Sequence, residues 1–192
     1  HGAKALGKPM GSYLTLEADK LLMPDEDFHS EVSDELALLL KGLLKQKTGK
    51  NILVAGLGNQ SVTPDSLGPR TVSNLCVSAE GLKAIAPGVM AQTGMETARI
   101  LLGIIKEVQP DLVIAIDALA ARSIRRLGTT IQLTDTGIHP GSGVGNHRRG
   151  MTRENLGVPV IAIGVPTVVG AAAIVHGTVN ALVRTLTASK EG

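Results

Sequence analysis

Aromatic residues and cysteines are almost missing from this sequence of 192 residues. Tyr13 and Phe28 are its only aromatic side chains, and it contains no tryptophan. A buried core must therefore be built from Val, Ile, Leu and Ala, and the aromatic platforms that stack single-stranded nucleic acids are lacking. The single cysteine, Cys76, excludes an internal disulfide and a cysteine-rich zinc site. We expect Cys76 to be a small buried hydrophobe on a helix, in a reducing compartment.

The sequence also contains few charged residues of either sign. Charged residues make up 19% of the chain and hydrophobic residues 43%, and the formal net charge is +2. This balance suits a buried core and excludes both a disordered chain and a polybasic protein that coats nucleic acid. We therefore expect no nucleic-acid partner. The length fits one domain, and because no linker or repeat divides the chain, residues 1–192 are interpreted as a single domain.

One stretch is long and apolar enough to raise the question of a membrane span. Residues 158–175 contain no charged side chain. Two prolines and two glycines interrupt this stretch, however, and would break a spanning helix. We expect a buried strand, a turn and the start of a helix there, and no membrane partner. With no recognisable secretory signal, the sequence predicts a cytoplasmic protein.

Apolar runs alternate with helical patterns along the chain. Three runs, at 51–57, 112–116 and 158–163, are apolar on both faces, which is typical of central strands in a parallel sheet covered on both sides. The remaining periodicity predicts two further strands, over 13–17 and 129–134, and helices over 28–46, 65–77, 93–108, 118–126 and 170–186. The alternation predicts an α/β fold with a mainly parallel sheet.

Acidic side chains follow the predicted strands at their carboxyl ends, where ligands gather in open parallel sheets. Asp65 comes after the first apolar strand, Asp117 directly follows the second, and Asp135 and His139 follow the strand over 129–134. If the first two strands are neighbours, Asp65 and Asp117 form a pair in which one carboxyl holds a proton and the other activates water. Alternatively, each of these two acids only caps a helix.

The irregular segment 135–155 contains five glycines between Gly137 and Gly150, and we expect it to border the same cleft as the acids. His139 in this segment could join Asp65 and Asp117 around a divalent ion, as in a metal-dependent hydrolase, or it could be an ordinary hydrogen-bonded loop histidine. The glycine-rich run lacks the spacing of nucleotide-binding loops, and no metalloprotease or serine-hydrolase motif is present. The leading interpretation therefore has no cofactor and no metal.

Arginine is concentrated in one part of the chain. Between Arg122 and Arg153 there are six arginines and a single acid, Asp135. This excess is either ordinary surface charge or a positive rim that holds an acidic peptide or another anion. Arg148 and Arg149, next to the glycine-rich run, are the candidate substrate-binding residues.

Several longer motifs resemble those of the germination protease family of spore-forming Firmicutes. The resemblance runs from about Gly2 to the final predicted helix and includes the Thr-Pro-Asp and Ala-Ile-Asp-Ala motifs. It is carried by the segments 62–69, 87–90, 111–123, 135–146 and 159–169.

This resemblance implies an endopeptidase that starts the degradation of small acid-soluble spore proteins in the spore core during germination. It also implies a zymogen that loses a short N-terminal piece, a homotetramer, and a three-layer α/β/α sandwich similar to that of hydrogenase maturation proteases. The two proposed catalytic aspartates of the family fall on Asp65 and Asp117. Against this resemblance, the segment between Val77 and Pro87 is shorter than expected, and family members are expected to continue with a sizeable C-terminal region beyond the point that corresponds to Gly192.

We therefore interpret the chain as a peptidase that uses two acids and a water molecule. One carboxylate would deprotonate the attacking water, while the other would protonate the leaving amine or polarise the carbonyl. Because such a pair titrates jointly, the sequence assigns neither role to a particular acid. Main-chain N–H groups of the glycine-rich run would stabilise the oxyanion. The alternatives are the metal-dependent hydrolase and a non-catalytic binding module whose acids only cap helices.

Overall fold

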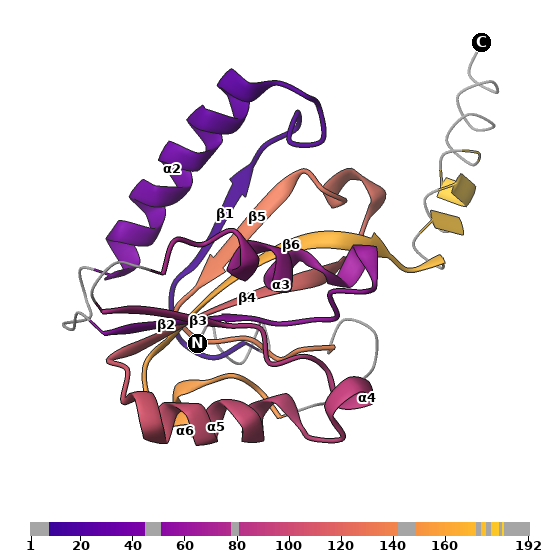
Figure 1. The fold of residues 1–192 in the computed structure, drawn as a ribbon. Coiled ribbons are helices and arrows are strands. Elements are labelled where there is room, and N and C mark those ends of the chain that lie inside the picture. Colours follow the sequence, from indigo (N-terminus) through magenta and orange to yellow (C-terminus); the bar gives the residue numbers. More distant parts are fainter. Residues whose placement is uncertain are drawn as a thin grey trace, which may run out of the picture.

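A mixed six-stranded sheet forms the middle layer of the molecule, with the strand order β1-β5-β6-β4-β2-β3 (Figure 1). The structure, a computed structural model, describes residues 8–44, 51–77, 81–141, 149–171, 174–175, 178–180 and 182. The strands are β1 (Tyr13–Glu17), β2 (Ile52–Gly56), β3 (Leu82–Ile85), β4 (Leu112–Ala121), β5 (Thr130–Thr134) and β6 (Val160–Val169).

Strands β6, β4, β2 and β3 run parallel to one another, whereas β5 is antiparallel to β6 and β1 is antiparallel to β5. The three strands that were predicted to be central, β2, β4 and β6, each have a neighbour on both sides, so that prediction is confirmed. Their apolar character on both faces is explained by helices on both sides of the sheet. Strand β3 was not predicted, because its four residues carry no long apolar run.

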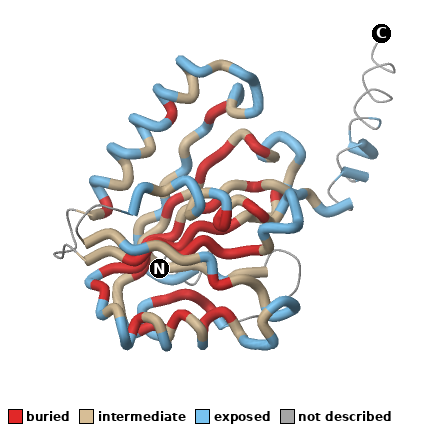
Figure 2. Tube along the Cα trace, in the orientation of Figure 1, coloured by how far each residue is buried: buried red, intermediate tan, exposed pale blue. Residues whose placement is uncertain are grey.

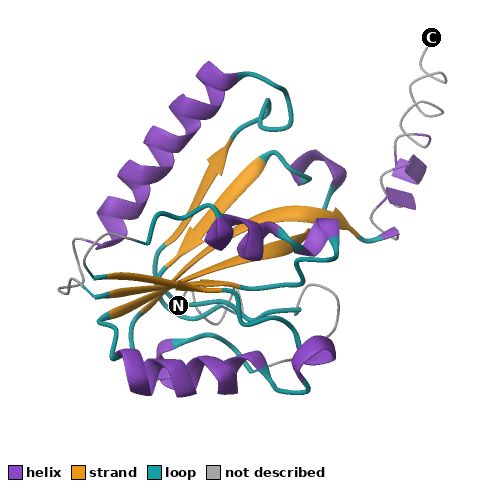
Figure 3. Ribbon diagram, in the orientation of Figure 1, coloured by secondary structure: helices purple, strands orange, loops and turns teal. Residues whose placement is uncertain are grey.

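Helices cover the two faces of the sheet and make three layers, as predicted (Figures 1 and 3). Helices α2 (Glu26–Leu44) and α3 (Leu67–Ser73) pack on one face, and α5 (Thr97–Val108) and α6 (Arg153–Leu156) pack on the other. Successive residues of a strand point to opposite faces, so Leu53 belongs to the α5 core and Val54 to the α2 core. Figure 2 shows the buried residues concentrated along the sheet.

The prediction of a short helix over 118–126 is wrong. Strand β4 continues through Asp117 to Ala121, and only one 3-10 turn, η2 (Ile124–Arg126), follows it. The alanine-rich run has a high helix propensity, but β6 extends beside it as far as Val169, and the pairing of the two strands overrides that preference.

The other helices differ from the predictions mainly at their ends. The helix predicted from residue 65 begins at Leu67, after the 3-10 turn η1 (Thr63–Asp65). The helix predicted over 93–108 is α5 and begins only at Thr97, because a separate short helix, α4 (Met90–Thr93), ends just before it at Gly94, whose φ is 68°. Most of the helix predicted over 170–186 lies outside the described residues. Among the helices that are described, none is both long and apolar enough to cross a bilayer.

Cys76 is exposed, beyond the end of α3 at Ser73. The prediction that it is a buried hydrophobe on a helix is therefore wrong. Its neighbour Leu75 packs against the α2 core instead. Helix α3 ends before Leu75 and Cys76, and the side chain of Cys76 is exposed to solvent.

Two glycines allow α3 to lie directly on the end of β2 and the middle of β4. A Cβ atom on Gly56 would collide with the carbonyl group of Gly68, and a Cβ on Gly68 would collide with the main chain of Leu57 and the carbonyl oxygen of Ile116. Because neither glycine carries a side chain, main chain packs on main chain at this point. The first turn of α3 is thereby held against the sheet.

We expect Gly68→Ala to destabilise the fold by about 1–3 kcal/mol, since the methyl group has no space. Gly103 is the matched control, because it lies in α5 with nothing within 4 Å of the position of a Cβ atom. Gly103→Ala should stabilise the protein by about 0.5–1 kcal/mol, the usual gain for replacing glycine inside a helix. Urea denaturation measures both changes. Equal stability of the two variants would contradict the proposed contact.

Candidate active site

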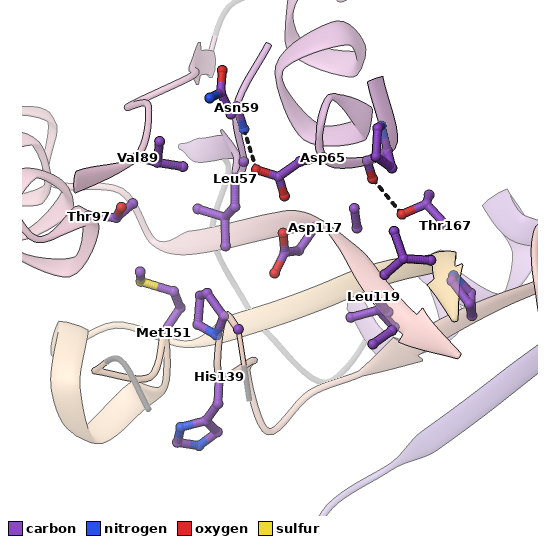
Figure 4. A pocket seen from close by; sticks show the side chains of 18 of the residues that line it. Leu57, Asn59, Asp65, Val89, Thr97, Asp117, Leu119, His139, Met151 and Thr167 are labelled. Carbon is purple, nitrogen blue, oxygen red and sulfur yellow. Dashed lines mark hydrogen bonds between the residues drawn. The ribbon is translucent and has the colours of Figure 1, made fainter. Parts of the chain in front are cut away.

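A cavity of about 690 Å³ lies beyond the carboxyl end of β2 and beside the second half of β4 (Figure 4). Several parts of the chain line it, among them the connection from β2 through η1, the start of α5, the second half of β4, the turn η2, the end of β6, and the segment that returns from β5 towards α6. The residues from these parts that matter below are Asn59, Asp65, Thr97, Asp117, Ala118, Ala120, Arg122, Arg126, His139, Arg149 and Met151.

Asp117 reaches this cavity from inside a strand. It is paired with Gly164 of β6 and is only 5% exposed. Val113 and Ala115, which point to the same side of β4, belong to the core under α5, so Asp117 faces that layer as well. No helix begins at Ala118, and the interpretation of Asp117 as a helix cap is therefore wrong.

Asp65 reaches the cavity from the end of η1 and is half-buried. Its Oδ2 accepts a hydrogen bond of 2.8 Å from the main-chain N–H of Asn59. Helix α3 begins only after Ser66, its N-cap residue. The carboxylate of Asp65 thus ties the loop after β2 to η1, and does not cap α3 as the alternative interpretation required.

The two acids face one another across the cavity (Figure 4). They are brought together because β2 and β4 are adjacent, with Gly56 paired to Ile116 immediately before Asp117. The main-chain N–H of Leu57 also donates to the carbonyl oxygen of Ile116, over 2.7 Å. The expected pair of carboxyl groups is present, but Asp117 lies within β4 and Asp65 at the end of η1, not directly at the ends of two strands.

A small network of hydrogen bonds holds the loop that carries Asn59, the hydrogen-bond partner of Asp65. The Oδ1 atom of Asn59 accepts hydrogen bonds from the main-chain N–H of Ser61 (2.9 Å) and from Nε2 of Gln92 (2.8 Å). Gly58 has a φ of 112°, and a side chain there would collide with the carbonyl oxygen of Asp65. Asn59 and Gln92 were not predicted as site residues, since single side-chain contacts of this kind leave no motif in the sequence.

Asp135 and His139 do not join the acid pair. Because β5 runs antiparallel to β6, Asp135 emerges at the opposite end of the sheet, where its Oδ1 accepts a hydrogen bond of 2.8 Å from the main-chain N–H of Ser12. His139 lines the cavity, but its ring points away from Asp117 in Figure 4 and packs against Gly150. Within the described residues, no three His, Cys, Asp or Glu side chains form a cluster that could hold a metal ion. The alternative of a metal site built from Asp65, Asp117 and His139 therefore has no support in the geometry.

The segment after β5 returns to the cavity, as expected. Ile138 forms an isolated bridge with Met151, and residues 139–141, Arg149 and Met151 line the cavity. The main-chain N–H of Arg149 donates to Oε1 of Glu96 over 3.0 Å. Arg148 and most of the glycine-rich run, with the N–H groups suggested for an oxyanion, lie outside the described residues.

Two further arginines line the cavity, although the sequence did not single them out. Arg122 directly follows β4, and Arg126 ends the turn η2. The arginine-rich tract thus contributes Arg122 and Arg126, after β4, and Arg149, beside Glu96, to the lining of the cavity. The sequence showed that arginines are concentrated in this tract, but it did not show which of them face the cavity.

Replacing Asn59 tests the loop network. Asn59→Ala removes the acceptor of two hydrogen bonds, and we expect a loss of stability of about 0.5–1.5 kcal/mol because these bonds are largely exposed. The neighbouring exposed residue supplies the control, Gln60→Ala, which should change stability by less than about 0.5 kcal/mol. Thermal unfolding compares the two variants. If both melt like the parent protein, the network does not hold the loop.

Residues 1–191 match the family model Peptidase_A25, described as germination protease. The chain is 51% identical to the germination protease of Caldanaerobacter subterraneus subsp. tengcongensis, over 96% of this chain and 61% of that protein. It is 48% identical to the germination protease of Bacillus subtilis and 46% identical to that of Priestia megaterium, in each case over 95% of this chain and 54% of the relative. The chain thus spans between half and two thirds of the length of these relatives.

A solved structure with a similar arrangement is the [NiFe] hydrogenase maturation protease HycI from Thermococcus kodakarensis. It is 19% identical to this chain, with a TM-score of 0.48 over 69% of this chain and 87% of that protein.

Proposed function

The chain belongs to the germination protease family, and from this premise we propose that it acts as an endopeptidase in spore germination, with Asp65 and Asp117 as its catalytic acids. The observation that carries the proposal is the position of these two carboxyl groups. They face one another in one cavity although they come from different elements. Helix capping, the structural explanation for acids at these positions, applies to neither of them.

The proposed reaction is hydrolysis of a peptide bond by a water molecule held between the carboxyl groups. One carboxylate takes a proton from the water, whose oxygen attacks the scissile carbonyl carbon, and the other carboxyl group donates a proton to the leaving nitrogen. The burial of Asp117 suits this role, because electrostatic interactions are stronger where bulk water is excluded. Chemistry of this kind needs only the two acids and water.

The family membership also supports the substrate and the setting that we propose. The substrates are small acid-soluble spore proteins, cut in the cytoplasm of the spore core, and the enzyme works as a homo-oligomer formed from a zymogen. The test of the substrate is to incubate the protein with a purified small acid-soluble spore protein and to map the fragments by mass spectrometry. Discrete cuts support the proposal, and an intact substrate at equimolar enzyme would refute it.

Conservative replacement of the acids separates catalysis from structure. Asp117→Asn and Asp65→Asn should each lower the cleavage rate by about 10²–10⁴-fold, because an amide neither accepts nor donates the proton at working pH. The double variant should be no slower than the slower single one, since members of one catalytic unit fail together. Melting temperature should change little, because asparagine keeps the shape and the oxygen acceptor.

Asp111→Asn is the matched control for these variants. Asp111 precedes β4 at the other end of the sheet, and its Oδ2 accepts a hydrogen bond of 2.9 Å from the main-chain N–H of Asn51. This change should leave cleavage at the parental rate. Near-parental cleavage by either Asp65→Asn or Asp117→Asn, with unchanged melting, would show that the mechanism is wrong.

Arg149 is proposed to hold substrate through its charge, together with Arg148. Replacing both residues with alanine should raise KM more than it lowers kcat, because an arginine side chain stays protonated and does not transfer a proton at working pH. The effect should shrink as salt is added, since exposed charges are screened within about 10 Å at about 0.1 M ionic strength. Steady-state kinetics at low and high salt measure this, with Arg70→Ala on α3 as the control. A KM that stays at the parental value at low salt would leave these arginines as ordinary surface charge.

A further inference from the structure

Strand β4 continues past the end of its neighbour β2. The last pair between the two strands is Gly56 with Ile116, whereas β4 runs on from Asp117 to Ala121 and is paired there only with β6, on its other side. This part of β4 therefore has an open edge on the side that β2 has left. The edge begins at Asp117, one of the two proposed catalytic acids, and its residues line the same cavity.

The main-chain groups along this edge follow from the strand geometry. The carbonyl oxygen of Ile116 accepts a hydrogen bond from Leu57, so the polar groups of Ile116 point towards the β2 side. In a strand these directions alternate from residue to residue, and Ala118 and Ala120 therefore present their N–H and C=O groups to the open edge. The register between β4 and β6 shifts here, because Leu119 pairs with Pro166 and Ala120 with Val168. The extra residue is in β6, so the alternating direction of the main-chain groups continues without interruption along β4.

These groups are available for pairing. Across the ranges that the structure describes, no loop or helix makes a backbone hydrogen bond to Ala118 or Ala120. Both residues are half-buried walls of the cavity, and their small side chains leave room beside the strand. An unpaired strand edge inside a cavity matches the main chain of another extended segment.

We propose that a substrate peptide binds as an added strand along Ala118–Ala120, with its scissile bond at Asp117. This inference rests on the proposed peptidase function and names the form in which the substrate is held. The occupant is an extended segment of polypeptide, because only a main chain supplies donors and acceptors with the two-residue period of the edge. A folded helix or a tight turn in a substrate would not fit.

The charge at the far end of the edge supports the same occupant. At about 3.3 Å per residue, Arg122 lies roughly 16 Å along the strand direction from Asp117. Arg122 and Arg126 both line the cavity there. A segment with an acidic side chain four or five residues from the bond that is cut would place that acid beside these arginines.

Single backbone methylation of a peptide tests the pairing directly. Overlapping twelve-residue peptides from a small acid-soluble spore protein are screened for binding to the parent protein by fluorescence anisotropy, and the tightest binder is resynthesised with one N-methyl group at each position in turn. On one side of the scissile bond, methylation should weaken binding at least tenfold at every second residue, because it removes a hydrogen bond and adds a clash. The intervening positions should change binding less than about threefold, since their N–H groups point away from β4.

The outcomes distinguish this inference from the proposed function. Binding with the two-residue period but without cleavage would support the added strand and refute the peptidase. Cleavage with losses that show no such period would keep the peptidase and overturn the added strand. The inference would be overturned if no peptide bound. It would also be overturned if the affinity for peptide fell as the protein concentration rose, because a second copy of the chain would then compete for the edge of β4.

Discussion

The carbonyl oxygen of Ile116 is the point on which the arrangement of the acids depends. It accepts the hydrogen bond from Leu57 that closes the last link between β2 and β4, and a side chain on Gly68 would strike it. Three segments therefore meet within one layer of main-chain contacts: the exit of β2, the first turn of α3, and β4 just before Asp117. The relative position of Asp65 and Asp117 is set by these contacts and not by flexible side chains.

This construction gives the two carboxyl groups different surroundings. Asp117 sits inside a strand, nearly buried, with the α5 layer on its side of the sheet. Asp65 sits at the end of a short turn, half-buried, and is held by the main chain of Asn59. Arginines stand further out around the same cavity. Because the acids and the arginines come from different elements, charge is distributed unevenly around the cavity, which favours one orientation of a long ligand such as a polypeptide.

Much of the fold could be predicted because its strongest signals are local. The continuous apolar runs of β2, β4 and β6 require cover on both faces, and they are the central strands. Asp65, in the connection after β2, and Asp117, directly after the apolar run of β4, come together because β2 and β4 are adjacent parallel strands. The direction of β5 could not be predicted, since nothing within Thr130–Thr134 encodes which way its neighbour runs. The extension of β4 was missed for a related reason: its alanines favour a helix in isolation, and only the pairing with β6 makes them a strand.

The antiparallel direction of β5 has a consequence for which parts of the chain can vary in length. Since β5 delivers the chain to the end of the sheet opposite the cavity, the residues from Asp135 to Ile138 are the stretch that brings His139 and the following wall residues back. A deletion there would withdraw one wall of the cavity. The connection from α3 to the outermost strand β3 carries no such demand, and none of its described residues lines the cavity. The shortened segment that the resemblance predicts, between Val77 and Pro87, falls in and next to this connection, where a change of length would leave the walls of the cavity in place.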